Sequence, residues 1–337
     1  MTRYSLLDLV PVVEGGSVAQ ALANAADIAR HAEAEGYHRY WTAEHHGMTG
    51  IASAATAVVL GHVAGATRTI RIGAGGIMLP NHAPLTIAEQ FGTLDALYPG
   101  RIDLGLGRAP GSDGRVAQAL RRTLASDAND FPRDVMELQS YFADDGRTGI
   151  VATPGAGARP QMWILGSSLF GAQLAAALGL PYAFASHFAP DALDQALAVY
   201  RRDFRPSAQL DRPYAMAGFN VFAAATDAEG ELLASSQQQA FVALRTGNPR
   251  QLPPPVANYR NVVGVQGSAI MDHVLQCSAV GSPATVARGI ASFLARTSVD
   301  ELLITSSIYD HAARKRSLTI AAQAMADVVA PETRAAA

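Results

Sequence analysis

An apolar, strand-like run alternates with a helix-like segment along almost the whole chain, and this alternation limits the possible folds more than any other feature. The first four runs recur roughly every 30 residues, the length of one strand, one helix and two loops. Between the first two runs, Val18 to Glu35 has apolar positions at helical spacing and stops at Gly36. The predicted strands begin near Ser5, His38, Ile70, Arg101, Gln161, Tyr182, Tyr214 and Glu301.

Strands that alternate with helices in this way predict an α/β fold, specifically a (β/α)8 TIM barrel with insertions after strands four and seven. Parallel strands need crossover connections, and helices must cover the outer face of the sheet. The length suits one such domain over residues 1–337, with insertions at about 109–160 and 226–300. We expect these insertions to be lids over the barrel mouth, or else surface and dimer contacts. A doubly wound open sheet is the main alternative, but the loop at Val13 to Ser17 lacks the GxGxxG order.

Charge and cysteine content limit the partners and the compartment. A net charge of -3 with dispersed Lys and Arg gives no basic stripe for nucleic acid. Cys277 is the single cysteine, which excludes an intrachain disulfide framework and fits a reducing cytoplasm. No leader precedes the first strand, and no apolar run reaches the ~18 residues of a membrane span. We therefore expect a soluble, cytoplasmic protein without a nucleic-acid or membrane partner.

Two histidines follow the second predicted strand, at the end where barrels of this class carry their sites. Strand alternation points His45 and His46 to opposite sides, so at least one imidazole should face the barrel mouth. An imidazole there can hold or transfer a proton near neutral pH, and structural packing is the alternative. Two ligands that point apart cannot share an ion, so we predict no metal site.

Glycines interrupt the third predicted strand at Gly75 and Gly76, inside an otherwise buried run. Glycine in a strand interior indicates a bulge or the close approach of a ligand, and a flat ligand fits both. The alternative is a packing adjustment inside a narrow barrel.

A candidate phosphate site combines Arg108, at the end of strand four, with the start of the helix after strand five. A guanidinium binds phosphate as a fork, and a helix N-terminus presents free N–H groups and a positive dipole end. Ser167, Ser168 and Gly171 lie at that helix start, although an ordinary serine N-cap would give the same sequence. Gly281 to Pro283, before a later helix, is a second candidate.

These motifs resemble, in order, those of the bacterial luciferase-like flavin monooxygenases, and most of all their single-gene luciferase-like oxidoreductase branch. The resemblance extends from Ser5 to about Val329. The matching motifs are Glu44-His45-His46, Gly75 to Pro80, Tyr98 to Arg108, Gly179 to Pro181 and Val280 to Pro283.

The resemblance implies an FMN-dependent oxidoreductase of the two-component monooxygenase type. A separate flavin reductase would supply reduced FMN, which together with O2 oxygenates a small organic substrate. The family likeness also implies a homodimer. Two alternatives stay open, a deazaflavin-dependent hydride-transfer oxidoreductase and a non-catalytic flavin-binding protein.

The resemblance also assigns roles to individual residues. His45 matches the proton-handling histidine, and Gly75-Gly76 matches a non-prolyl cis peptide beneath the flavin ring. Arg108, Ser167, Ser168 and Gly171 match the phosphate site. His187, at the end of strand six, matches a position that lines the flavin or substrate pocket.

Overall fold

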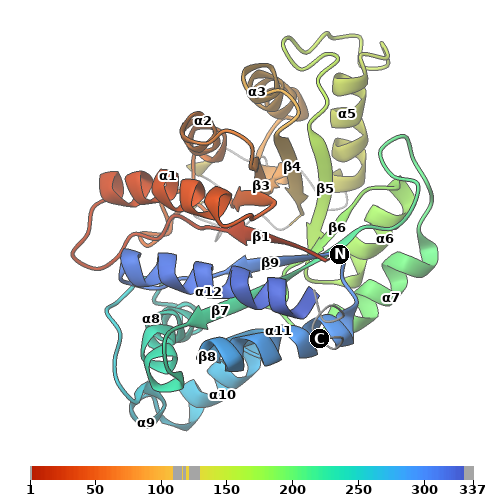
Figure 1. The fold of residues 1–337 in the computed structure, drawn as a ribbon. Coiled ribbons are helices and arrows are strands. Elements are labelled where there is room, and N and C mark those ends of the chain that lie inside the picture. The colour runs from red at the N-terminus through yellow and green to blue at the C-terminus, as the bar shows by residue number, and fades with distance from the viewer. Residues whose placement is uncertain (1, 109–115, 117–118, 121–129, 330–337) are drawn as a thin grey trace.

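Eight parallel strands close into a barrel surrounded by helices, in a computed structural model that describes residues 2–108, 116, 119–120 and 130–329 (Figure 1). The barrel strands are β1 (Arg3–Leu7), β2 (Arg39–Thr42), β3 (Arg71–Met78), β4 (Ile102–Gly107), β5 (Gln161–Gly166), β6 (Tyr182–Phe184), β7 (Ala215–Ala223) and β9 (Glu301–Thr305). They pair in the order β6-β5-β4-β3-β2-β1-β9-β7, and β6 pairs with β7 to close the ring. The predicted (β/α)8 TIM barrel is confirmed.

Helices follow the strands and pack around the barrel (Figure 1). The first helix forms where the apolar periodicity of the sequence predicts it. Its N-cap residue Ser17 accepts a hydrogen bond from the Gln20 N–H at 3.1 Å. Ala25, Ile28 and Ala29 are buried along one face of the helix. The helices that follow barrel strands are α1 (Val18–Ala34), α2 (Thr56–Ala66), α3 (Pro84–Leu97), α5 (Phe131–Ala143), α6 (Leu169–Leu178), α7 (Leu193–Asp203), α8 (Asp227–Arg245) and α12 (His311–Val329), and η1 (Leu79–Asn81) is a short 3-10 turn.

A ninth strand, β8 (Ser278–Gly281), was not expected from the sequence. It pairs only with the second half of β7, from Asn220 with Ser278 to Ala223 with Gly281, and so lies outside the closed ring. The first half of β7 pairs with β9, and the strand then continues past the barrel. A run of four mostly small residues is too short to predict a strand from the sequence. β8 forms because it pairs with the edge of β7 that extends beyond the barrel.

The second predicted insertion consists of regular structure. Besides α8 and β8, it contains α9 (Tyr259–Val262), α10 (Gly264–Val274) and α11 (Pro283–Thr297). In the first insertion α5 is described, whereas residues 109–115, 117–118 and 121–129 lie outside the described residues. In the described part of the chain, no helix has both the length and the apolar character needed to cross a bilayer.

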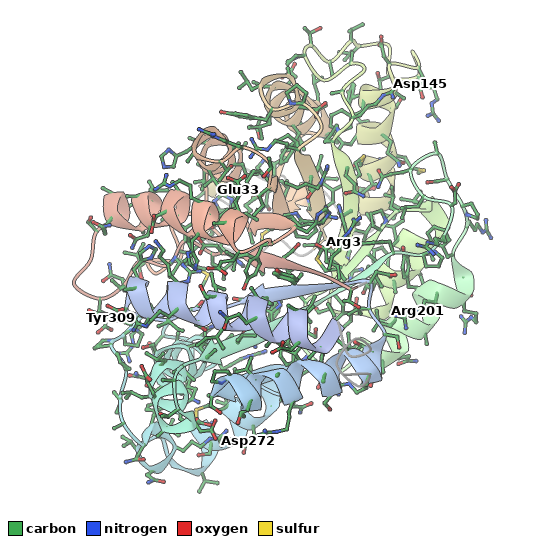
Figure 2. All side chains as sticks on the ribbon, in the orientation of Figure 1. Arg3, Glu33, Asp145, Arg201, Asp272 and Tyr309 are labelled. Carbon is green, nitrogen blue, oxygen red and sulfur yellow. The ribbon has the colours of Figure 1, made fainter. Side chains whose placement is uncertain are left out.

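Side chains fill the space between the barrel and its helices (Figure 2). Glu33 of α1, labelled there, accepts hydrogen bonds from the N–H groups of Arg68 and Ile70, both at 2.9 Å, and from that of Thr69. Burial alone would raise the pKa of Glu33, but these bonds lower it to about 2. The carboxylate thus fixes the loop that leads into β3.

A buried ionic cluster closes the barrel at the N-terminal ends of its strands. Arg39 contacts Asp103 and Glu301, each at 2.8 Å, and all three side chains are buried. The Arg39 guanidinium also lies 4.8 Å from the ring centroid of Trp163, which meets Trp41 edge to face. This end of the barrel is a packed plug, so the space for a ligand is at the other end.

Candidate active site

Two adjoining cavities open at the C-terminal ends of the barrel strands. The larger, of about 330 Å³, is lined by residues of several strand ends together with α8, and we call it the barrel cavity. The smaller, of about 210 Å³, is lined by Arg108 and the start of α6, and we call it the Arg108 cavity. The residues that line both are Ala43, His45, Gly75, Leu165, Ala185 and Phe188.

The two histidines after β2 have different surroundings. His45 lines both cavities, whereas His46 Nε2 donates to the Glu44 carboxylate at 2.7 Å. Among the described residues the His45 ring has no hydrogen-bond partner. Burial lowers the pKa of His45, and the nearby Glu44 charge only partly opposes this effect. A neutral imidazole therefore faces the cavities at neutral pH.

Glu44 itself is buried and anchors the loop that carries His45. Its carboxylate lies 2.9 Å from His82 Nε2 and accepts the Met78 N–H at 2.9 Å. Burial acts to raise the pKa of Glu44, but the hydrogen bonds from His82, the Met78 N–H and His46 outweigh burial and lower the pKa. The sequence argument missed His82, although its place directly after the strand-three turn was a usable signal.

Gly75 and Gly76 are joined by a non-proline cis peptide, and the pairing of β3 with β4 shifts register there. A β-carbon at Gly75 would lie 2.6 Å from Cε3 of Trp41, and one at Gly76 would lie 2.6 Å from the Gly105 carbonyl oxygen. Packing inside the barrel therefore already requires glycine at both positions. Both glycines also line the Arg108 cavity, so the peptide forms part of its floor.

The candidate phosphate residues Arg108, Ser167, Ser168 and Gly171 all line the Arg108 cavity. The Arg108 guanidinium carbon lies 4.1 Å from the Phe170 ring centroid, and the side chain has no carboxylate partner among the described residues. Ser168 is the N-cap residue of α6, but its side chain makes no capping hydrogen bond. The hydroxyl and the helix N–H groups thus stay available to an anion.

The second phosphate candidate, at Gly281 to Pro283, is already occupied by the chain itself. Asp227 Oδ1 accepts the Ser282 N–H at 2.7 Å, at the start of α11. That bond lowers the pKa of Asp227, so a charged carboxylate contacts the N-cap residue of α11. The residues of the first candidate, by contrast, line a cavity.

His187 lines the barrel cavity and not the Arg108 cavity. Its Nδ1 atom is buried without a hydrogen-bond partner in the described structure. Burial, and to a lesser extent the nearby His45, lowers the pKa of His187 to about 4. Nδ1 therefore has no partner among the described residues as donor or as acceptor, and Nε2 is the ring nitrogen left for a ligand.

Several lining residues came only from the tertiary structure. Phe188, after β6, lines both cavities. The barrel cavity is also bounded by Met48, Gln237 and Phe241, among others. No group of three His, Cys, Asp or Glu side chains in the described part of the chain is arranged to hold a metal ion.

The closed barrel, with its candidate site at the C-terminal ends of the strands, has the architecture of the TIM-barrel enzymes. The chain belongs to the luciferase-like monooxygenases, whose family model matches residues 3–301.

Relatives and solved structures agree with this family. A luciferase-like monooxygenase of Escherichia coli is 54% identical over 319 residues, which cover 94% of this chain and 95% of the relative. An N-acetyl-S-alkylcysteine monooxygenase of Bacillus subtilis is 35% identical over 254 residues, covering 73% of this chain and 75% of that protein. The crystal structure of apo MsnO8 has a TM-score of 0.87 and 33% identity, covering 97% of this chain and 99% of that one.

A more distant structure shows the fold alone. The oxygenating constituent of 3,6-diketocamphane monooxygenase from Pseudomonas putida, determined with FMN, has a TM-score of 0.70 at 18% identity. It covers 96% of this chain and 97% of that chain.

Proposed function

We propose that this monooxygenase uses reduced FMN and O2 to oxygenate a small organic substrate. The observation that carries the proposal is the meeting of Arg108, the uncapped start of α6 and the Gly75-Gly76 floor around one cavity. Reduced FMN, when bound, supplies the electrons that activate O2. A neighbour of the same fold was determined with FMN, which supports the choice of this flavin.

The residues of the Arg108 cavity fit the two ends of FMN. Arg108 would hold the phosphate as a fork, and Ser167 and Ser168 would add hydroxyl donors at the helix N-terminus. No carboxylate of residues 2–108, 116, 119–120 or 130–329 pairs with Arg108, which leaves its charge for the ligand. The flat ring would lie over Gly75 and Gly76, where the floor carries no side chain.

His45 stands where the two cavities join, so it would touch both the ring and the substrate. Its lowered pKa keeps it neutral, and a neutral imidazole can accept one proton and return it. His187 would hydrogen-bond a ligand atom in the barrel cavity through Nε2. Mostly apolar walls there exclude water and strengthen both hydrogen bonds.

The reaction requires reduced flavin, and the sequence has no nicotinamide-binding fingerprint after its first strand. We assign the reduction to a separate flavin reductase, and we expect the enzyme to act as a homodimer. A relative is an N-acetyl-S-alkylcysteine monooxygenase, so organic thioethers are the first substrates to assay.

Titration with oxidised FMN, reduced FMN and deazaflavin, followed by fluorescence quenching, tests the cofactor. We expect Arg108→Ala to weaken FMN binding about 10- to 100-fold, because a charge-assisted phosphate contact is lost. The matched control is Arg133→Ala on α5, whose guanidinium is exposed and pairs with Asp130 and Asp134.

Three outcomes would contradict the proposal. Equal FMN affinity in Arg108→Ala would remove this residue from the phosphate site. Tight binding of deazaflavin but not FMN would favour hydride transfer without O2. FMN binding without oxygen consumption on any thioether, ketone or alkane would favour a non-catalytic flavin-binding protein.

A further inference from the structure

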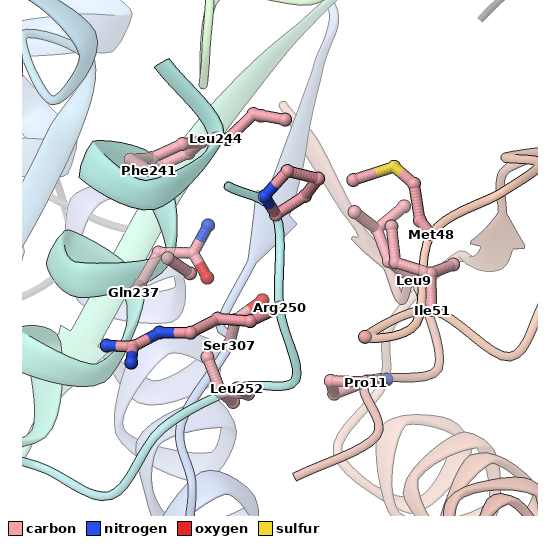
Figure 3. A pocket seen from close by; sticks show the side chains of 13 residues that line it. Leu9, Pro11, Met48, Ile51, Gln237, Phe241, Leu244, Arg250, Leu252 and Ser307 are labelled. Atoms are coloured by element: carbon pink, nitrogen blue, oxygen red, sulfur yellow. The ribbon is translucent and has the colours of Figure 1, made fainter. Parts of the chain in front are cut away.

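The barrel cavity continues outward into a third cavity of about 110 Å³, which we call the outer pocket (Figure 3). It lies between α8 and the segments at residues 9–11 and 48–51, and Figure 3 shows the two walls facing each other. The residues that line both the outer pocket and the barrel cavity include Leu9, Met48, Ile51, Gln237, Phe241 and Leu244.

The outer pocket shares no lining residue with the Arg108 cavity. The three cavities are therefore arranged in a row, with the barrel cavity and His45 in the middle. A ligand anchored at Arg108 fills one end of this row. The opposite end is left for a different molecule, and that molecule reaches His45 only through the barrel cavity.

The walls of the outer pocket are apolar, and its polar groups stand at its two ends. Gln237, at the junction with the barrel cavity, carries an amide without a hydrogen-bond partner among the described residues. Arg250 lies at the outer edge, 3.7 Å from Glu14, so its charge is already balanced. The pocket thus favours an uncharged, aliphatic occupant with one polar group near Gln237.

Backbone hydrogen bonds fix the segment around Leu252 that lines the outer pocket. The Leu252 N–H donates to the Val12 carbonyl at 2.9 Å, and the Glu14 N–H donates to the Leu252 carbonyl at 2.8 Å. A β-carbon at Gly50 would lie 2.4 Å from the Arg250 carbonyl oxygen, so glycine lets the two loops meet. The pocket is a formed cavity and not a gap between loose surface side chains.

We infer that the outer pocket binds the aliphatic tail of the organic substrate, while the Gln237 amide binds a polar group of the same molecule at the junction. The substrate is then elongated, with an uncharged chain of several carbons leading away from the reacting group. This inference rests on the proposed function, because it takes the Arg108 cavity as the flavin end of the row.

The test uses 1-hexanol, 1-octanol and 1-decanol as probes, titrated calorimetrically into the full-length protein with and without saturating FMN. For the native chain we expect affinity to rise about fourfold for each added methylene that enters the apolar pocket. Leu244→Trp fills the pocket from α8 and should abolish this rise between 1-octanol and 1-decanol. Met48→Trp does the same from the opposite wall, which guards against a local folding defect in one variant.

The matched control is Leu232→Trp, on the same helix as Leu244. Leu232 is 37% exposed and Leu244 45% exposed, but only Leu244 lines the cavity row. We expect Leu232→Trp to keep the full chain-length dependence. Gln237→Leu should keep that dependence and weaken every alcohol by a common factor of about 3 to 10, since one hydrogen bond is lost.

The two proposals fail in different ways. A chain-length dependence that is absent in the native chain, or unchanged in Leu244→Trp and Met48→Trp, overturns the tail site even if FMN binds normally. Conversely, loss of the dependence in these two variants supports the tail site even if FMN titrations contradict the assigned cofactor. FMN affinity itself should be the same in Leu244→Trp and Leu232→Trp.

Discussion

His187 packs so closely against Gly218 that a β-carbon on this glycine would lie 2.1 Å from the Nδ1 atom. The contact buries Nδ1 without a partner and turns the rest of the ring toward the barrel cavity. Gly218 lies on β7, the strand that pairs with β6, and its missing side chain thus lets the His187 ring pack against that strand.

The lowered pKa of His187 predicts a loss of stability in acid. Its pKa falls from 6.5 to about 4 on folding, so the unfolded chain binds a proton more readily between these values. The stability due to neutral His187 is fully present above about pH 6.5 and is lost as the pH falls toward 4, by up to about 3 kcal/mol. Denaturant unfolding at a series of pH values should show that the free energy of unfolding falls less steeply with decreasing pH in His187→Asn than in the native chain.

The control for this pH series is His62→Asn, at an exposed position on α2. Its free energy of unfolding should fall with decreasing pH as steeply as that of the native chain. An identical pH dependence for His187→Asn and the native chain would mean that His187 is not held neutral by burial.

Gly218→Ala should disturb the cavity without touching a ligand. The new methyl group displaces the His187 ring, and overpacking of this kind destabilises a protein by about 1–3 kcal/mol. Calorimetric melting would measure the loss. Gly61→Ala, on α2, is the control, because its β-carbon would lie 3.6 Å from Cδ2 of Leu94 on α3, an ordinary contact. Equal melting temperatures for the two variants would contradict the close packing of His187.

His45→Ala should separate binding from chemistry. We expect FMN affinity within about threefold of the native value, because the phosphate contacts remain. Substrate-dependent oxygen consumption should fall about 10²- to 10⁴-fold, the usual contribution of a positioned acid–base group. His46→Ala is informative beside it, since His46 contacts Glu44 and lines neither cavity. A smaller loss in His45→Ala than in His46→Ala would argue against proton transfer by His45.

Asp103→Ala should test the ionic plug at the closed end of the barrel. It would leave Arg39 buried with Glu301 as its remaining charged partner, and breaking a buried pair costs about 3–5 kcal/mol of unfolding free energy. Urea unfolding checks this value. The control Asp203→Ala breaks an exposed pair with Arg202 and should leave the unfolding midpoint unchanged. FMN affinity of the folded Asp103→Ala protein should be native, because the plug lies away from the mouth.

The sequence alone determined the barrel and the position of its mouth. Eight strand starts and the helices between them follow from apolar periodicity, which is a local property of the chain. Alternation likewise separated His45 from His46, and the ends of strands four and five placed Arg108 and Ser168 on one rim. Parallel strands in a closed ring always bring their carboxyl ends together, so these residues had to converge.

Only the tertiary structure decided what surrounds them. β8 exists because β7 outruns the barrel, and His82 matters because it meets the buried Glu44. The outer pocket depends on Gln237 facing Met48, two residues far apart in the chain that no periodicity relates. Such contacts are set by how insertions pack against the mouth, and side-chain packing over long sequence separations leaves no repeating trace in the sequence.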